Sequence, residues 1–177
     1  MVGPPGEGKT MLVAAMNPSP CGYFGSTKRE CHCSYTQIQR YRTRVSGPLM
    51  DRIDIHMDVP AVEYRELSAK EQGKTSAEIL EDLQKAREAQ KERFRNLKIY
   101  NNAGMTGRHI RKFCQIDRDS DGLLETAMEK LGLSARAHSR ILKIARTIAD
   151  VEGSENITAD HIAEAIQHRS LDRKIVK

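Results

Sequence analysis

The sequence predicts a partial α/β segment built around a phosphate-binding loop, followed by a mostly α-helical domain. A glycine-rich loop opens the chain, and two short apolar runs after it stop at prolines, as buried strands do. From residue 76 onward the apolar residues recur at helical spacing between capping residues. These observations predict a partial core over residues 1–60, a polar linker over 61–75 and a helical domain over 76–177.

The composition is that of a globular protein. Of the 177 residues, 38% are hydrophobic and 30% are charged, which argues against a disordered tail. No apolar run approaches the ~20 residues that a membrane helix needs. The first residues also lack the apolar stretch of a secretory signal. We therefore expect a cytoplasmic protein without a membrane partner, whose four cysteines are thiols or metal ligands, not disulfides.

Residues 3–10 match the phosphate-loop pattern G-x-x-x-x-G-K-[ST], which predicts binding of ATP and Mg²⁺. The glycines let backbone N–H groups surround phosphates, while Lys9 would reach the β/γ-phosphates and the Thr10 hydroxyl would bind Mg²⁺. The nucleotide-binding residues are then Gly3, Pro4, Pro5, Gly6, Glu7, Gly8, Lys9 and Thr10.

The surroundings of this loop are incomplete. The mechanism needs a strand before the loop and a helix after it, but only six residues separate Thr10 from Asn17-Pro18. The chain also has no apolar run ending in the acidic pair that hydrolysis requires. The alternatives are a working nucleotide site and a vestigial tail, and we expect this chain to be catalytically inactive.

Each later element has its own signal. Residues 11–16 and 53–59 predict strands, the second because it alternates apolar and polar residues before Pro60. Ser34 predicts the start of a helix that ends at Gly47-Pro48. The apolar periodicity predicts five more helices, over 76–95, 106–114, 123–131 and 134–151 and from Thr158 onward. Gly132 and Gly153 are expected to end the third and fourth of these.

Three cysteines, Cys21, Cys31 and Cys33, lie within 13 residues of one another. Thiolates on a short loop can bind Zn²⁺ if a fourth ligand closes the tetrahedron, and His32, His56 or another chain could supply it. The spacing lacks the paired C-x₂-C of common zinc folds, so reduced, partly buried thiols are the alternative. Cys114 lies on an apolar helix face and is expected in the core.

Residues 28–52 carry six basic side chains against two acidic ones. A basic stretch that is partly helical can meet the phosphates of a nucleotide or of nucleic acid, so DNA is a candidate partner. A solvated helix face is the alternative.

Two long stretches carry a specific resemblance. Residues 14–60, AAMNPSPCGYFG to DRIDIHMDVP, and residues 133–153 with the following ITADHIAEAI resemble magnesium-chelatase-like AAA+ ATPases of the ComM/YifB type. The resemblance covers nearly the whole chain from residue 11. It implies an α/β AAA+ remnant followed by the helical AAA+ lid. The family's loop helix and Walker B acids are absent, so Thr10 is joined to Met11 across an internal deletion.

The resemblance also implies roles for three residues. Asn17 matches sensor 1, which orients the attacking water, although an Asn-Pro turn would also explain it. Arg52 matches the arginine finger that reaches a neighbouring subunit's ATP, although a local ion pair with Asp51 or Asp54 is the alternative. Arg136 matches sensor 2, with Arg140 in reserve.

As a function, the resemblance implies an ATP-hydrolysing motor that forms a homo-oligomeric, hexameric ring and is associated with DNA branch migration in competence. The missing core predicts that this chain is an inactive part of such a motor. The alternative is a non-catalytic helical module, stabilised by Zn²⁺, that binds nucleic acid or protein. Unpaired strands in the remnant would favour a dimer or strand exchange.

Overall fold

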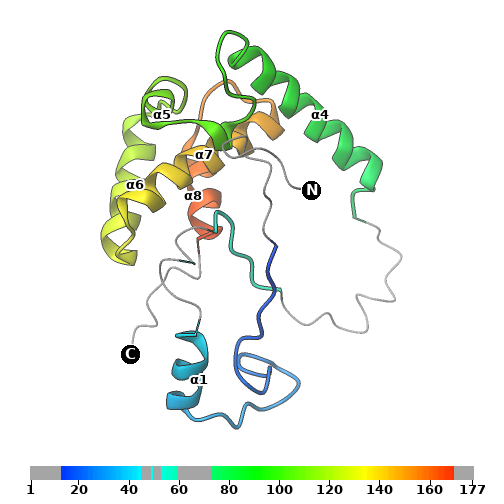
Figure 1. Cartoon of the computed structure of the whole chain (residues 1–177), viewed down its shortest axis with the longest axis vertical. Helices are drawn as coiled ribbons and strands as arrows, with labels where there is room; N and C mark the ends of the chain where they lie inside the picture. Colours follow the sequence, from blue (N-terminus) through cyan, green and yellow to red (C-terminus); the bar gives the residue numbers. More distant parts are fainter. Residues whose placement is uncertain (1–12, 45–48, 50–52, 60–72, 170–177) are drawn as a thin grey trace. The chain divides into compact units, whose positions relative to one another are not determined.

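The computed structural model describes residues 13–44, 49, 53–59 and 73–169, which divide between two compact units. The first unit comprises residues 1–53 and 58–70, and the second comprises residues 54–57 and 71–177. The regular structure in the described ranges is entirely helical (Figure 1). None of these helices is both long enough and apolar enough to cross a membrane.

The second unit is a bundle arranged around helix α7. In chain order its elements are α4 (Ser76–Arg93), the 3₁₀ turn η1 (Asn102–Gly104), α5 (Gly107–Phe113), α6 (Arg118–Leu131), α7 (Ala135–Glu152) and α8 (Ala159–Gln167). Helix α7 contacts α4, η1, α5 and α8, and α6 packs against α8 (Figure 1). Helix α7 is therefore the central helix of this unit.

The expected helix ends are confirmed where the sequence carries a capping residue. The Thr75 hydroxyl accepts the backbone N–H of Glu78 at the start of α4, and Ser134 does the same for Ala137 at the start of α7. Gly132 and Gly153 end α6 and α7 with φ of 60° and 74°. Only glycine adopts this left-handed backbone without a steric penalty, which explains both stops.

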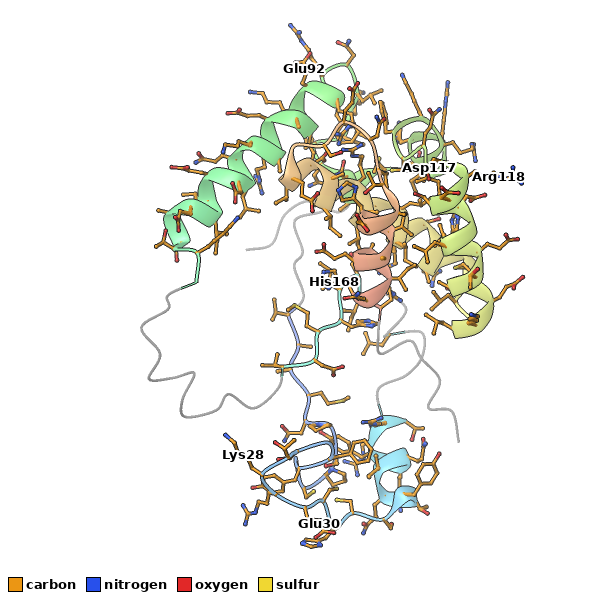
Figure 2. All side chains as sticks on the ribbon, turned by 180° about the vertical axis from the view of Figure 1, so that it is seen from behind. Lys28, Glu30, Glu92, Asp117, Arg118 and His168 are labelled. Atoms are coloured by element: carbon orange, nitrogen blue, oxygen red, sulfur yellow. The ribbon has the colours of Figure 1, made fainter. Side chains whose placement is uncertain are left out.

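Helix α6 begins five residues earlier than the expected 123–131, at Arg118. The side chain of Asp117 accepts the backbone N–H of Ser120 at 2.8 Å and caps the helix there (Figure 2). The first turn and a half has no apolar residue, so the hydrophobic period that marks a helix appears only at Leu123.

The core of the second unit combines branched side chains with alanines. Leu124 of α6, Ile141 of α7 and Ile162 of α8 are at most 1% exposed. Ala145 and Ala149 on α7 are completely buried in the same cluster. Small side chains let neighbouring helices approach closely, and the branched residues fill the space between them. Cys114 also lies in this core, as expected.

The expected strands are wrong for the residues that the structure describes. Residues 13–16 belong to a short apolar run and residues 53–59 alternate apolar and polar side chains, but neither segment has a ladder of backbone hydrogen bonds to another segment in the described ranges. A strand needs such a partner for its backbone groups. Within the second unit, the backbone N–H of His56 instead bonds to the carbonyl of His168, at 2.7 Å.

Several expectations lie outside the described residues. These are the phosphate loop over residues 3–10, the arginine-finger position Arg52, the helix stop at 47–48 and most of the linker over 61–75. Helix α1 (Tyr35–Arg42) of the first unit is described, and it begins after Ser34 as predicted.

We expect Ile141→Ala to lower the free energy of unfolding by about 2–5 kcal/mol, because it empties a fully buried site at the centre of α7. The measurement is urea denaturation followed by helical circular dichroism. Val151→Ala is the matched control, since Val151 lies on the same helix and is 38% exposed. Equal losses in the two variants would contradict the central position of α7.

Candidate functional site

The first turn of α7 carries the arginine expected to contact a nucleotide. Ser134 caps the helix, and Ala137 and Ile141 bury its inner face. Arg136, between the cap and Ala137, is exposed. Arg140, one turn further, forms an ion pair with Asp54 of the same unit, and only 20% of its side chain is exposed. Of these two arginines, Arg136 is the more exposed.

The sensor 1 candidate Asn17 belongs to the first unit, where it is exposed and precedes a tight turn. The backbone N–H of Gly22 bonds to the carbonyl of Ser19 at 3.0 Å, and Gly22 has φ of 83°. Asn17 and Arg136 thus lie in different units, and Arg52 lies outside the described residues. The roles that the resemblance implies for these three residues stay predictions.

The three cysteines expected to bind a metal come together in the first unit. The Sγ atoms of Cys21, Cys31 and Cys33 all lie within 4.8 Å of one another, and those of Cys21 and Cys31 are 3.4 Å apart. These residues belong to the loop that carries Lys28 and Glu30, both labelled in Figure 2. The structure thus forms a compact sulfur cluster from residues up to 12 positions apart.

A fourth polar group, the Ser19 hydroxyl, joins this cluster without a signal for it in the cysteine pattern. Ser19 is completely buried, and its Oγ atom lies 3.4 Å from Cys21 Sγ and 3.8 Å from Cys31 Sγ. The same oxygen accepts the backbone N–H of Phe24 at 3.2 Å. The only available signal was its position two residues before Cys21, which mirrors the spacing of Cys31 and Cys33.

Neither histidine expected as the fourth ligand is part of the cluster. His32 is exposed, and no His, Asp or Glu of the described ranges joins the three thiols. His56 belongs to the second unit, where it is buried.

The thiols do not titrate alike. The Ser19 hydroxyl and the backbone N–H of Tyr23 donate hydrogen bonds toward the Cys21 sulfur and lower its pKa to about 6. The hydrogen bond between Cys33 and Cys21, aided by desolvation, raises the pKa of Cys33. Cys21 therefore ionises first, and Cys33 keeps its proton beside it.

Helix α1 presents basic side chains on the same unit. Over residues 13–44 there are five basic residues and one acidic residue. Arg42 is used internally, since its Nε donates to the carbonyl of Pro18 at 3.1 Å and its guanidinium lies 5.1 Å from the centre of the Phe24 ring. Arg40 and Arg44 are exposed. These two are the side chains of α1 and its C-terminal end that can meet phosphates.

A buried charge network in the second unit was not predicted. The Asp150 side chain is 1% exposed and accepts hydrogen bonds from Arg93 of α4, Asn102 of η1 and Arg146 of α7. Arg146 also donates to the carbonyls of Ser154 and Glu155, at 2.6 and 2.7 Å. The sequence signal was an Arg and an Asp four residues apart, a spacing that is equally common on exposed helix faces.

This network determines the ionisation of Asp150. Burial alone would raise its pKa, but hydrogen bonds from Arg93 and Asn102 and the charges of both arginines outweigh burial and lower it. The carboxylate is therefore ionised, and each of its oxygens is satisfied by at least two donors.

Comparison with known proteins identifies relatives for both units. The family model "Magnesium chelatase, subunit ChlI C-terminal" matches residues 73–169, and the model "Magnesium chelatase, subunit ChlI" matches residues 9–67. Competence protein ComM of Haemophilus influenzae is 41% identical over 167 residues, which are 94% of this chain and 32% of that protein. The uncharacterized protein YifB of Escherichia coli is 39% identical over 166 residues, 93% of this chain and 32% of that protein. The chain thus spans about a third of the length of these relatives.

We expect Asp150→Asn to lower the free energy of unfolding by about 3–5 kcal/mol at pH 7, because it leaves the buried Arg146 without its counter-charge. The folded pKa of Asp150 is lowered, so its contribution is present above the unfolded pKa of about 3.9 and is lost as pH falls through the folded value. Stability should consequently depend less on pH in the variant than in the parent between about pH 5 and pH 3.

Urea denaturation at several pH values measures both effects. Glu125→Gln on α6 removes an exposed carboxylate and is the matched control. A loss at pH 7 no larger than that of the control, or an unchanged acid dependence, would contradict the role of Asp150.

Proposed function

This chain belongs to the magnesium chelatase ChlI family, and we propose that it supplies the lid and part of the nucleotide-facing core of an AAA+ ATPase of the ComM/YifB kind. The helical unit supports the lid assignment, because the family's C-terminal model spans every helix from α4 to α8. The partial α/β core over residues 1–60, the linker over 61–75 and the helical lid over 76–177 are parts of this proposal.

The position of Arg136 is the observation that carries the proposal. A lid arginine that stabilises charge on a γ-phosphate must be exposed and must project from a rigid element. Arg136 is exposed in the first turn of α7, and that helix is fixed along its inner face by Ile141, Ala145 and Ala149. Its guanidinium would move together with the lid as one body.

The remaining roles follow the family pattern. Residues 3–10 would hold the phosphates of ATP, with Thr10 on Mg²⁺. Bound Mg²⁺ would neutralise charge on the β- and γ-phosphates. Asn17 would orient water, and Arg52 would act on the ATP of a neighbouring copy, which requires a homo-oligomeric ring.

We further propose that this chain does not hydrolyse ATP by itself. Hydrolysis in P-loop enzymes uses an acidic residue at the end of an apolar strand to hold Mg²⁺ and water. The chain contains no apolar run that ends in the acidic pair Asp-Glu. The partial core and the helical lid would therefore belong to an ATPase whose acidic Mg²⁺-binding residue is supplied by other residues.

Binding of DNA is the second candidate function, and the exposed arginines of α1 and of the residues just after it favour it. Arg40 and Arg44 lie in a region with five basic residues and one acidic residue. Clustered cations of this kind bind phosphate backbones by releasing counterions.

A chimera tests the lid assignment. Residues 73–169 would replace the matching segment of the Haemophilus influenzae relative, and the chimera is expected to hydrolyse ATP. Arg136→Ala in the chimera should lower kcat by about 100- to 1,000-fold, because it removes a donor to charge that develops in the transition state. Arg111→Ala, which removes an exposed arginine of α5, should leave kcat unchanged.

The chain itself is assayed beside the chimera. Its turnover is expected to equal that of its Lys9→Ala variant. An active chimera that is insensitive to Arg136→Ala would refute the sensor role, and Lys9-dependent turnover by the chain alone would refute its inactivity.

For DNA, we expect Arg40→Ala with Arg44→Ala to weaken duplex binding and to reduce the slope of log K against log salt by about 1.8, the value for two lost phosphate contacts. Fluorescence anisotropy over a salt series measures both quantities. Arg87→Ala with Lys91→Ala removes the same charge from exposed positions of α4. Equal effects of the two pairs would show that only net charge matters.

A further inference from the structure

The described part of the first unit has almost no core of its own. Among its described residues only Ser19 and Ile38 are buried. A segment that buries so little apolar surface cannot offset the entropy of ordering its loop, and small folds of this kind depend on a metal or a covalent link. The question is which of these orders the turn at residues 18–25 and the loop at 26–33.

The geometry points to a zinc ion, and we propose that Cys21, Cys31 and Cys33 bind one Zn²⁺ with the Ser19 hydroxyl at the fourth corner. Zinc–sulfur bonds of about 2.3 Å in a tetrahedron place sulfur atoms about 3.8 Å apart, with oxygen and sulfur corners about 3.5 Å apart. The observed separations are 3.4 Å for Cys21 and Cys31, and 3.4 and 3.8 Å from Ser19 Oγ to those two sulfurs. The third thiol lies within 4.8 Å of both others. Small shifts of these sulfur and oxygen atoms would thus give the separations of a tetrahedral zinc site.

A disulfide explains the cluster less well. It would join two of the three sulfurs and leave the third without a role, although all three converge. It would also leave unexplained why a buried hydroxyl lies against two of the thiols. Three thiolates and one oxygen supply four donors at one point, which is what a tetrahedral ion requires.

The proposed ion would also orient α1. Cys33 immediately precedes Ser34, the residue that caps this helix. At the other end of α1, Arg42 donates to the carbonyl of Pro18, next to Ser19. Both ends of α1 are therefore connected to the loop that the ion would close, and the site is structural, since each of its donors is a protein atom.

The test is metal analysis of the full chain, purified under reducing conditions and supplied with Zn²⁺. We expect one zinc per chain, retained after removal of free metal. Cys31→Ser should weaken zinc binding by about 100-fold or more in a chelator competition, since a ligand is worth at least as much as an outer-shell partner. Cys114→Ala, which removes the buried thiol of the second unit, should retain the full amount.

Cobalt substitution tests the ligand set independently of variant folding. The parent chain loaded with Co²⁺ should show tetrahedral d–d bands and a sulfur-to-metal charge-transfer band from three thiolates. Ser19→Cys should raise the charge-transfer intensity per metal by about one third and bind zinc more tightly, because it adds a fourth thiolate at the right distance. Ser19→Ala should weaken zinc binding by about 10-fold or more.

Limited trypsin digestion gives a third measure. Lys28, Arg29 and Arg40 lie on the loop and helix that the ion would fix, so zinc should slow cleavage there. A chain that stays free of zinc with reduced thiols, or one whose Cys21 and Cys31 form a disulfide while zinc is absent, overturns the site. Unchanged zinc affinity in both Ser19 variants overturns the assignment of the fourth corner.

Discussion

The second unit depends on one ionised carboxylate in its interior. Asp150 is desolvated, which opposes its charge, and it remains ionised only because Arg93, Asn102 and Arg146 approach it from three elements. A buried ion group of this kind tolerates few alternative arrangements, since losing any partner leaves a charge or donor unsatisfied. It therefore fixes the end of α4, the η1 turn and the last turns of α7 relative to one another.

The two units are stabilised by different kinds of contact. The second buries branched residues and alanines around α7 and adds the Asp150 network. The first has one buried aliphatic side chain in its described part, where the other contacts involve polar groups, aromatic rings and sulfur atoms. Arg29 on Tyr23 and Arg42 on Phe24 are examples, with ring distances of 4.7 and 5.1 Å. Such contacts are individually weak when exposed, so the loop needs an additional constraint.

Local signals were sufficient for most helices and insufficient for contacts between elements. Ser34, Ser134, Gly132 and Gly153 mark helix ends because capping is decided within a few residues. The strand expected over 53–59 is wrong. Alternation of apolar and polar residues is a property of one segment, whereas a strand also requires a second segment to which its backbone can hydrogen-bond. The partners of Asp150 could not be predicted for the same reason, since Arg93 lies 57 residues away in the sequence. The position of Ser19 beside the thiols could not be predicted, because a lone serine carries no metal-binding pattern.

Helix α7 connects stability with the proposed activity. Its last turns carry Asp150, and its first turn carries Arg136. Because a helix transmits displacement along its axis with little deformation, a shift of the Asp150 network relative to the core would move Arg136 as well. Arg140, paired with Asp54, further restrains the N-terminal half of this helix. In its proposed role, Arg136 must be held in place before charge develops on the phosphate, and the buried carboxylate at the opposite end of the same helix would provide that support.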